Sequence, residues 1–126
     1  MKNVLSGLVL VSLALMVPSA HAEGPSATAV VCLKVEDRAP AGAGTTFPVE
    51  VGELACFSEL RGVTGPIHHV WFHGEENVRD IELAVKAGRW RTWSVKRIPP
   101  TSTGDWRVEV RTADGTVLAT AEFKIE

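Results

Sequence analysis

Apolar and polar residues alternate on both sides of Asp114-Gly115, in the last third of the chain. Such alternation is typical of strands with one buried face, and an Asp-Gly pair is a strong signal for a two-residue hairpin turn, because both central positions need positive φ. A turn there pairs residues whose numbers sum to 229: Trp106 with Phe123, Val108 with Ala121 and Val110 with Ala119 on one apolar face, and Asp105 with Lys124 and Arg107 with Glu122 on the other. Two independent patterns therefore predict the same register.

A second hairpin is predicted just upstream. Residues 81–85 alternate as a strand and Ala87-Gly88 offers a turn, after which comes the tryptophan-rich stretch WRTWS. In this hairpin Trp90 lies on the core side, while Trp93 lies on the opposite face, beside the acids of residues 80–82. A bulge between the two tryptophans would turn both rings inward instead.

Three further segments are predicted strands, namely Ala29–Val35, Leu54–Leu60 and Ile67–His73. The stretch from Ala39 to Thr46 is predicted to be a flexible loop between the first two. A helix over residues 76–85, capped by Asn77, is an alternative to the strand there, but the strict alternation favours the strand. About seven short strands predict an all-β chain folded as an antiparallel Ig-like β-sandwich. We expect its core to contain Trp71, Trp90, Trp106 and Phe123.

Residues 1–22 have the order of a cleavable secretion signal. Lys2 is followed by the apolar stretch Val4–Val17 and by the triplet Ala20-His21-Ala22, an Ala-x-Ala pattern at which a signal peptidase would cut. The apolar stretch is shorter than the roughly 20 residues that span a bilayer, and no cysteine directly follows the cleavage site. We therefore expect a mature chain of residues 23–126, a single sandwich domain that is periplasmic or secreted and has no membrane span.

Charge narrows the choice of partner. The formal net charge of −2 becomes −3 when Lys2 is removed with the signal. Such mild acidity argues against nucleic acid, because phosphate binding normally needs a broad basic patch, and only residues 86–97 are locally basic. Gly42-x-Gly44 lacks the rest of a phosphate-binding loop, and we expect no cofactor.

The mature chain has two cysteines, Cys32 and Cys56, and export would place them in an oxidising compartment where pairing is the default. We therefore expect a disulfide that encloses the 23 residues from Leu33 to Ala55. Closing a loop of that size stabilises a fold by roughly 3 to 4 kcal/mol. A thiol metal site is the competing interpretation, but the pair lacks the short CxxC spacing.

One ordered set of residues resembles a known family. It comprises His69-x-Trp71, WRTWS at residues 90–94 with Lys96, Gly104-x-Trp106-x-Val108-x-Val110, Asp114-Gly115 and Phe123. The set resembles the bacterial domain-of-unknown-function family numbered 2914, over roughly residues 29–126 and including Cys56-Phe57. The resemblance implies an envelope-associated, extracytoplasmic β domain, usually at the C-terminal end of longer proteins, and it implies no activity. This chain departs from the longer members in being little more than the domain behind a signal.

The histidines invite a metal hypothesis, because imidazole binds zinc and copper. On a strand His68 and His69 point to opposite faces, and His69 and His73 are about 13 Å apart at roughly 3.3 Å per residue, too far for one ion. We expect no metal and a structural role for His69 beside the core. A copper or zinc site at His69 and His73, completed by nearby acids, is the alternative function.

A small hydrolase is the third hypothesis, with Ser94 as nucleophile and a histidine as base. Ser94 does not lie in a strained elbow of the GxSxG kind. We therefore expect no enzymatic activity and no catalytic residue.

The basic tryptophan-rich segment is the candidate ligand site, and two interpretations fit it. In one, the arginines pair with neighbouring acids while their stems cover the rings. In the other, Arg91 and Trp93 form an exposed cationic aromatic surface, to which Arg89, Lys96 and Arg97 add charge. We adopt the second, which predicts a non-catalytic accessory module of the bacterial envelope that recognises an anionic glycan or an envelope protein.

Overall fold

The computed structural model describes residues 24–126, and their regular structure is almost entirely β-strand. The predicted signal peptide, residues 1–22, lies outside the described residues. The elements are β1 Ser26–Ala27, β2 Val30–Cys32, β3 Lys34–Glu36, β4 Ala39–Ala41, β5 Thr46–Phe47, the 3-10 turn η1 Val49–Val51, β6 Glu53–Arg61, β7 Ile67–His73, β8 Glu76–Leu83, β9 Arg89–Arg97, β10 Gly104–Thr112 and β11 Val117–Ile125. No helix in this part of the chain is long and apolar enough to cross a membrane.

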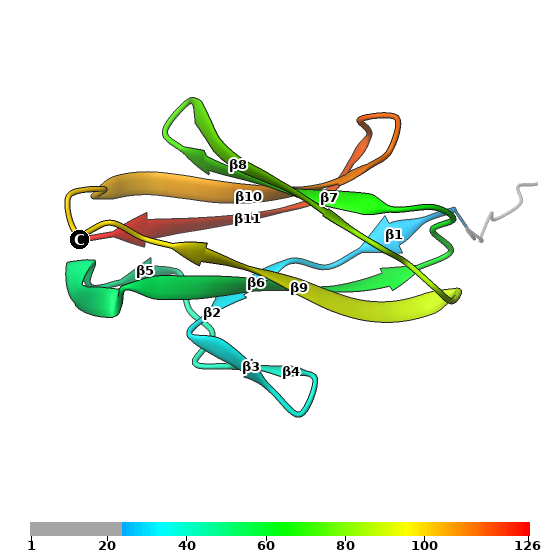
Figure 1. Cartoon of the computed structure of the whole chain (residues 1–126), viewed down its shortest axis with the longest axis horizontal. Coiled ribbons are helices and arrows are strands. Elements are labelled where there is room, and N and C mark those ends of the chain that lie inside the picture. The colour runs from blue at the N-terminus through cyan, green and yellow to red at the C-terminus, as the bar shows by residue number, and fades with distance from the viewer. Residues whose placement is uncertain (1–23) are drawn as a thin grey trace, which may run out of the picture.

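Two stacked sheets form a β-sandwich (Figure 1). In the four-stranded sheet β6 is central, and it pairs with β9 along one side and with the short β1 and β2 along the other. The five-stranded sheet has the order β5-β11-β10-β7-β8, and all its pairs are antiparallel except the short contact of β5 with β11. The chain crosses between the sheets from β6 to β7 and from β8 to β9, as in immunoglobulin-like sandwiches. The predicted all-β antiparallel sandwich is confirmed.

The C-terminal hairpin has the predicted register. β10 and β11 pair Trp106 with Phe123, Val108 with Ala121 and Val110 with Ala119. The register shifts beyond Val110, and Gly115 takes a φ of 93° while its N–H donates to the carbonyl oxygen of Thr112. The chain therefore turns through Thr112–Gly115, and the left-handed Gly115 forms a bulge at its end. The predicted two-residue turn is wrong, although this longer turn closes the same hairpin.

The predicted hairpin at Ala87-Gly88 is wrong. β8 pairs with β7 at the edge of the five-stranded sheet, and β9 pairs with β6 at the edge of the four-stranded sheet. The segment between β8 and β9 thus links the two sheets instead of turning one strand back onto its neighbour. Alternation correctly predicted a strand, and not a helix, within residues 76–85, but it carries no information about the strand's partner.

The first predicted strand, Ala29–Val35, bends at Leu33. Its first part is β2, and its second part is β3, which leaves the sandwich and pairs with β4 as a projecting hairpin (Figure 1). The predicted flexible loop therefore begins with a strand. Asp37 and Arg38 close this hairpin with φ values of 52° and 60°, the left-handed conformation that a tight hairpin turn requires at both central positions.

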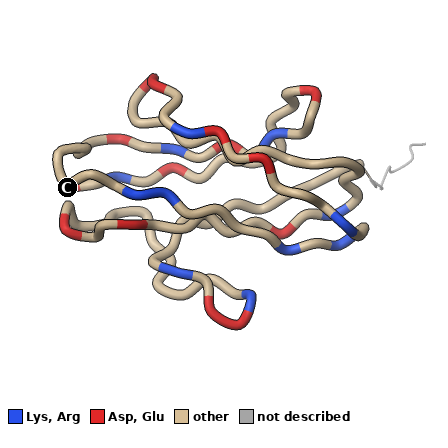
Figure 2. Tube along the Cα trace, in the orientation of Figure 1, with Lys and Arg blue, Asp and Glu red and all other residues tan. Residues whose placement is uncertain are grey.

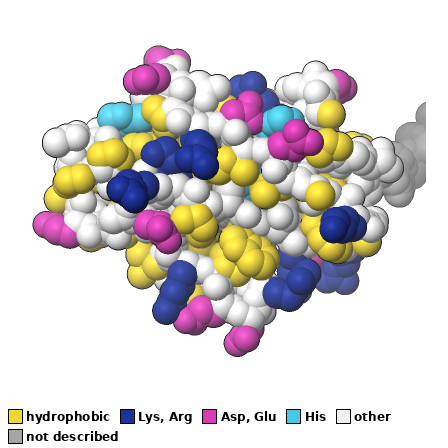
Figure 3. Space-filling view, in the orientation of Figure 1, with side chains coloured by type: hydrophobic (Ala, Val, Ile, Leu, Met, Phe, Trp, Pro, Cys, Tyr) yellow, Lys and Arg dark blue, Asp and Glu magenta, His cyan; other side chains and the backbone are white. Residues whose placement is uncertain are grey.

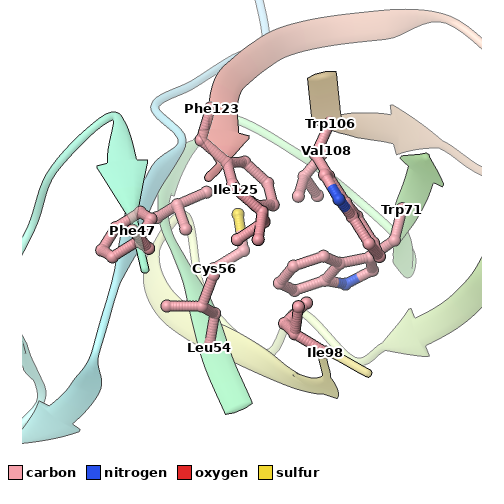
Figure 4. Close-up of a cluster of buried hydrophobic side chains, with 10 residues drawn as sticks. Phe47, Leu54, Cys56, Trp71, Ile98, Trp106, Val108, Phe123 and Ile125 are labelled. Carbon is pink, nitrogen blue, oxygen red and sulfur yellow. The ribbon is translucent and has the colours of Figure 1, made fainter. Parts of the chain in front are cut away.

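Aromatic rings fill the space between the two sheets (Figure 4). The Phe123 ring stacks on Trp106 with centroids 5.7 Å apart, and it meets Trp71 and Phe47 edge-on. Trp71, Trp106 and Phe123 are buried, as predicted. Trp90 is half-buried and packs against a second cluster that contains Leu60.

Cys32 and Cys56 form no disulfide, and both are free and buried. Cys32 is the cross-strand partner of Ala55, and Val31 is that of Cys56, so the two thiols differ in strand phase and point to opposite faces of one sheet. Cys56 packs in the core between the sheets, whereas Cys32 packs with Ala55 and Phe57 on the outer side. The predicted bridge is wrong, because cysteine side chains that point apart cannot be joined without backbone movement.

Candidate functional site

β9 separates the predicted ligand residues onto two faces. Its exposure alternates along the strand, and the residues that face away from the other sheet are Arg89, Arg91, Trp93, Val95 and Arg97. Lys96 has the opposite phase and turns towards the five-stranded sheet, where its Nζ lies 5.9 Å from the ring centroid of Trp106. The structure thus brings four of the five predicted residues together and places Lys96 elsewhere.

We call the outward residues of β9, with those paired beside them on β6, the Trp93 face: Arg89, Arg91, Trp93, Val95, Arg97, Glu53, Ala55, Phe57, Glu59 and Arg61. β6 and β9 run along the lower layer of Figure 1. In the same orientation, Figure 3 shows hydrophobic side chains gathered over these strands with Lys and Arg groups around them. The surface therefore combines an apolar centre with a charged border in which four arginines outnumber Glu53 and Glu59.

Trp93 is held in place but not covered. Its cross-strand partner is Phe57, and the two rings stack with centroids 6.4 Å apart and planes inclined by 17°. Phe57 is itself buried against Cys32, with Val35 of the β3–β4 hairpin packed on the same cluster. Trp93 remains 36% exposed, so its ring is presented to solvent in a defined orientation.

The positive charge of the Trp93 face is only partly neutralised. The Glu59 carboxylate accepts a hydrogen bond from Arg89 at 3.1 Å and lies 3.4 Å from Arg61. The bond from Arg89, helped by the nearby charges of Arg61 and Arg91, lowers the pKa of Glu59. Arg91 donates to the backbone carbonyl of Arg38 at 3.4 Å, and within residues 24–126 neither Arg91 nor Arg97 makes an ion pair.

The sequence did not reveal what β6 and the β3–β4 hairpin add to this face. The acids expected beside β9 belong to the other sheet, where Asp80 lies 2.6 Å from His68 Nδ1. Glu59 takes their place because β6, not β8, is the neighbour of β9. Alternation within Leu54–Leu60 could have put Phe57 and Glu59 on one outward face, but only the tertiary pairing puts that face beside Trp93.

His69 is a core residue that ties the two sheets together. From β7, its Nε2 lies 2.8 Å from Ser58 Oγ on β6, and its Nδ1 lies 2.7 Å from Ser94 Oγ on β9. The indole N–H of Trp71 donates to the same Ser94 oxygen at 3.1 Å. A neutral imidazole satisfies these contacts, with one ring nitrogen donating and the other accepting. Burial lowers the pKa of His69 to about 4.

The histidine geometry does not favour the metal hypothesis. Both ring nitrogens of His69 are already engaged, and His73 Nε2 donates to the carbonyl oxygen of Thr103 at 2.7 Å. Among the residues that the structure describes, no group of three or more His, Cys, Asp and Glu side chains is arranged to hold a metal ion. His69 and His73 therefore act as hydrogen-bonding residues in this fold.

Ser94 and His69 have the residue types of a nucleophile and its base. Their exposed fractions are 4% and 0%, so the surrounding side chains close the pair to a substrate. Their contact is better explained as a structural hydrogen bond, because a buried polar group without a hydrogen-bond partner destabilises the fold.

The fold and the Trp93 face together define a small immunoglobulin-like β-sandwich with one aromatic, cationic strand surface. Residues 65–125 match the model of the family described as "Protein of unknown function (DUF2914)", and the chain belongs to this family. The match takes in β7 to β11, so β1 to β6, with Cys56-Phe57, lie outside it. No curated protein matches the chain.

Proposed function

We propose that this chain is a non-catalytic binding module of the bacterial cell envelope and that the Trp93 face is its ligand site. The envelope location rests on the secretion signal expected at residues 1–22. The observation that carries the binding role is an exposed tryptophan stacked on a buried phenylalanine. Tryptophan and arginine are enriched at the energetic centres of binding surfaces, and a ring already held in place loses little conformational freedom when a ligand docks.

The charge of the Trp93 face favours an anionic ligand. Arg91 and Arg97 lie on either side of Trp93 along the same strand face, and in the described structure neither makes an ion pair with its cross-strand glutamate, Glu59 and Glu53 respectively. A guanidinium group binds a carboxylate through two parallel hydrogen bonds. A ligand with carboxylates close to an apolar surface would therefore contact the arginines and the ring together.

An anionic glycan fits this face better than a folded protein does. The exposed large apolar side chains on it are Trp93 and Val95, at 36% and 44% exposure. Stable protein interfaces bury roughly 1,200 to 2,000 Å² of surface around a largely apolar centre. Trp93 and Val95 alone would supply only a small part of such an area. A sugar ring, in contrast, is covered by one indole.

Calorimetric titration of the purified mature chain with an acidic polysaccharide, polygalacturonate, tests this proposal. We expect binding that weakens as salt is added, because exposed charges are screened, and no binding to neutral dextran. Trp93→Ala should abolish binding and Arg91→Gln should weaken it. Lys124→Gln, which removes one positive charge from β11 of the other sheet, should change nothing.

The Trp93→Ala variant should also unfold within a few degrees of the wild-type Tm, because the ring lies outside the core. Unchanged polysaccharide binding by this variant would place the site elsewhere. Binding to a folded protein partner, lost in the same variant, would keep the Trp93 face as the site but overturn the glycan as its ligand.

A further inference from the structure

Two cations from different sheets meet at one open edge of the sandwich. β8 and β9 are edge strands of the five-stranded and four-stranded sheets, and they run close to one another on the same side of the molecule. Arg79 on β8 is the cross-strand partner of the inward-facing Trp71. Lys96 on β9 also turns inward, above the Trp106 ring, and its Nζ donates to the carbonyl oxygen of Arg97 at 2.6 Å.

Positive charge gathers at this edge, although Glu53 is the cross-strand partner of Arg97. Figure 2 shows basic positions on both β8 and β9, and in Figure 3 Lys and Arg side chains lie next to one another in the region where these two strands run. Within residues 24–126 no ion pair involves Arg79, Lys96 or Arg97. Partial burial, with the nearby charges of Arg79 and Arg97, lowers the pKa of Lys96, as expected where like charges are held together.

We infer that Arg79 and Lys96 form a binding site for a divalent oxyanion, a phosphate group, which bridges the edge strands β8 and β9. Lysine supplies a compact point charge and arginine a planar fork of donors, and both are common phosphate ligands. The neighbouring Arg97 adds a third positive charge, so a doubly charged oxyanion neutralises the edge better than a carboxylate does. The two ligands of this site lie outside the Trp93 face, because Lys96 has the opposite phase on β9 and Arg79 belongs to the other sheet. Arg97 belongs to that face and contributes only its nearby charge.

A bridging phosphate would join the two sheets at an edge where each strand has a neighbour on one side only. A ligand that binds the folded state alone raises stability by mass action. Phosphate should therefore protect the domain against unfolding, and the protection should need one cation from each sheet.

Thermal unfolding in inorganic phosphate and in chloride, at equal ionic strength and pH 7.5, tests the inference. At roughly ten times the dissociation constant, phosphate should raise the wild-type Tm by at least about 5 °C. Arg79→Gln and Lys96→Gln should each lose most of this rise, while Lys86→Gln, which removes one exposed charge elsewhere, should keep it. Glycerol phosphate as a second probe separates the sources: protection equal to that of inorganic phosphate indicates a phosphate ester on a larger ligand, and weaker protection indicates the free ion.

A wild-type rise below about 1 °C, or an equal rise in the Arg79 and Lys96 variants, would overturn the inference. Should either variant fail to fold, a phosphate titration of the wild-type chain by ¹H–¹⁵N NMR decides the matter. The resonances of Arg79, Lys96 and the Trp106 indole should move while the Trp93 indole stays in place. Movement of the Trp93 indole instead would assign the phosphate to the Trp93 face, and this result is independent of whether that face binds a glycan.

Discussion

Lowering the pH from 7 to 4.5 is expected to destabilise the fold through His69. Burial lowers the pKa of this imidazole from 6.5 to about 4. Because the folded-state pKa lies below the unfolded value, the unfolded chain binds the proton first as the pH falls. The stabilising contribution is complete above about pH 6.5 and decreases until about pH 4. A difference of about 2.5 pKa units corresponds to about 3 kcal/mol, most of which is lost by pH 4.5.

The contacts of His69 explain the size of this effect. The ring is fully buried, and its partners on β6 and β9 are hydroxyl groups rather than carboxylates. Without a nearby negative charge, an imidazolium ion in the core would be desolvated and uncompensated. The pKa values of Glu59 and Glu109 are lowered in the folded state. The stability that these carboxylates contribute is therefore present above their unfolded-state pKa of 4.5, and it is lost only at lower pH.

Urea unfolding followed by tryptophan fluorescence, at several pH values between 7 and 4.5, measures this slope. The His69→Gln variant keeps a neutral hydrogen-bonding side chain and should lose the pH dependence, even if it is less stable throughout. His68→Gln is the matched control, since that ring is partly exposed on the outer side of the same strand. Equal slopes for the wild type and His69→Gln, or an NMR titration of His69 near pH 6.5, would refute the reasoning.

Three further predictions concern stability. Ser94→Ala should lower the free energy of unfolding by about 1 to 3 kcal/mol, because an imidazole and an indole both lose their partner, whereas the exposed Thr120→Ala should be nearly neutral in the same chemical denaturation. A reducing agent should leave the Tm of the mature chain unchanged, and a drop in Tm on reduction would reveal a bridge. A thiol reagent should react with Cys32 and Cys56 only after unfolding, because both thiols are buried and burial raises the pKa of Cys56 to about 12. Arg38→Gly should raise stability by about 0.5 to 1 kcal/mol, because glycine adopts the left-handed conformation of the hairpin turn without strain, and a loss of stability would show that the side chain contributes more than the strain costs.

The parts of the fold that the sequence predicted correctly are those whose evidence is local. The β10–β11 register follows from residues at most 21 positions apart, Gly104 to Ile125, and strand phase within β7 and β9 follows from alternation alone. These features explain why Trp71, Trp106 and Phe123 were correctly assigned to the core. Their burial depends on phase and not on the identity of the neighbouring strand.

The error that most affects the candidate site is the choice of partner strand. β9 was expected to pair with the strand that precedes it, but it pairs with β6, which begins 36 residues earlier in the chain. The same missing information assigned the wrong acids to the arginines. The disulfide was predicted from the oxidising compartment alone, and it fails because Cys32 and Cys56 differ in strand phase on the paired strands β2 and β6. Many partners can satisfy one alternating pattern, and the correct one is selected by packing across the whole sandwich.

The WRTWS stretch illustrates how phase divides one segment between structure and surface. Trp90 and Ser94 turn inward, where Ser94 completes the hydrogen bonds of His69 and Trp71, while Arg91 and Trp93 turn outward beside Phe57. The three-residue spacing of the tryptophans therefore sends one ring towards the core and the other to solvent, without the bulge that would bury both. A substitution at an inward position should act on unfolding, and one at an outward position on binding. An inward change that altered binding alone would show that the two faces of β9 are not independent.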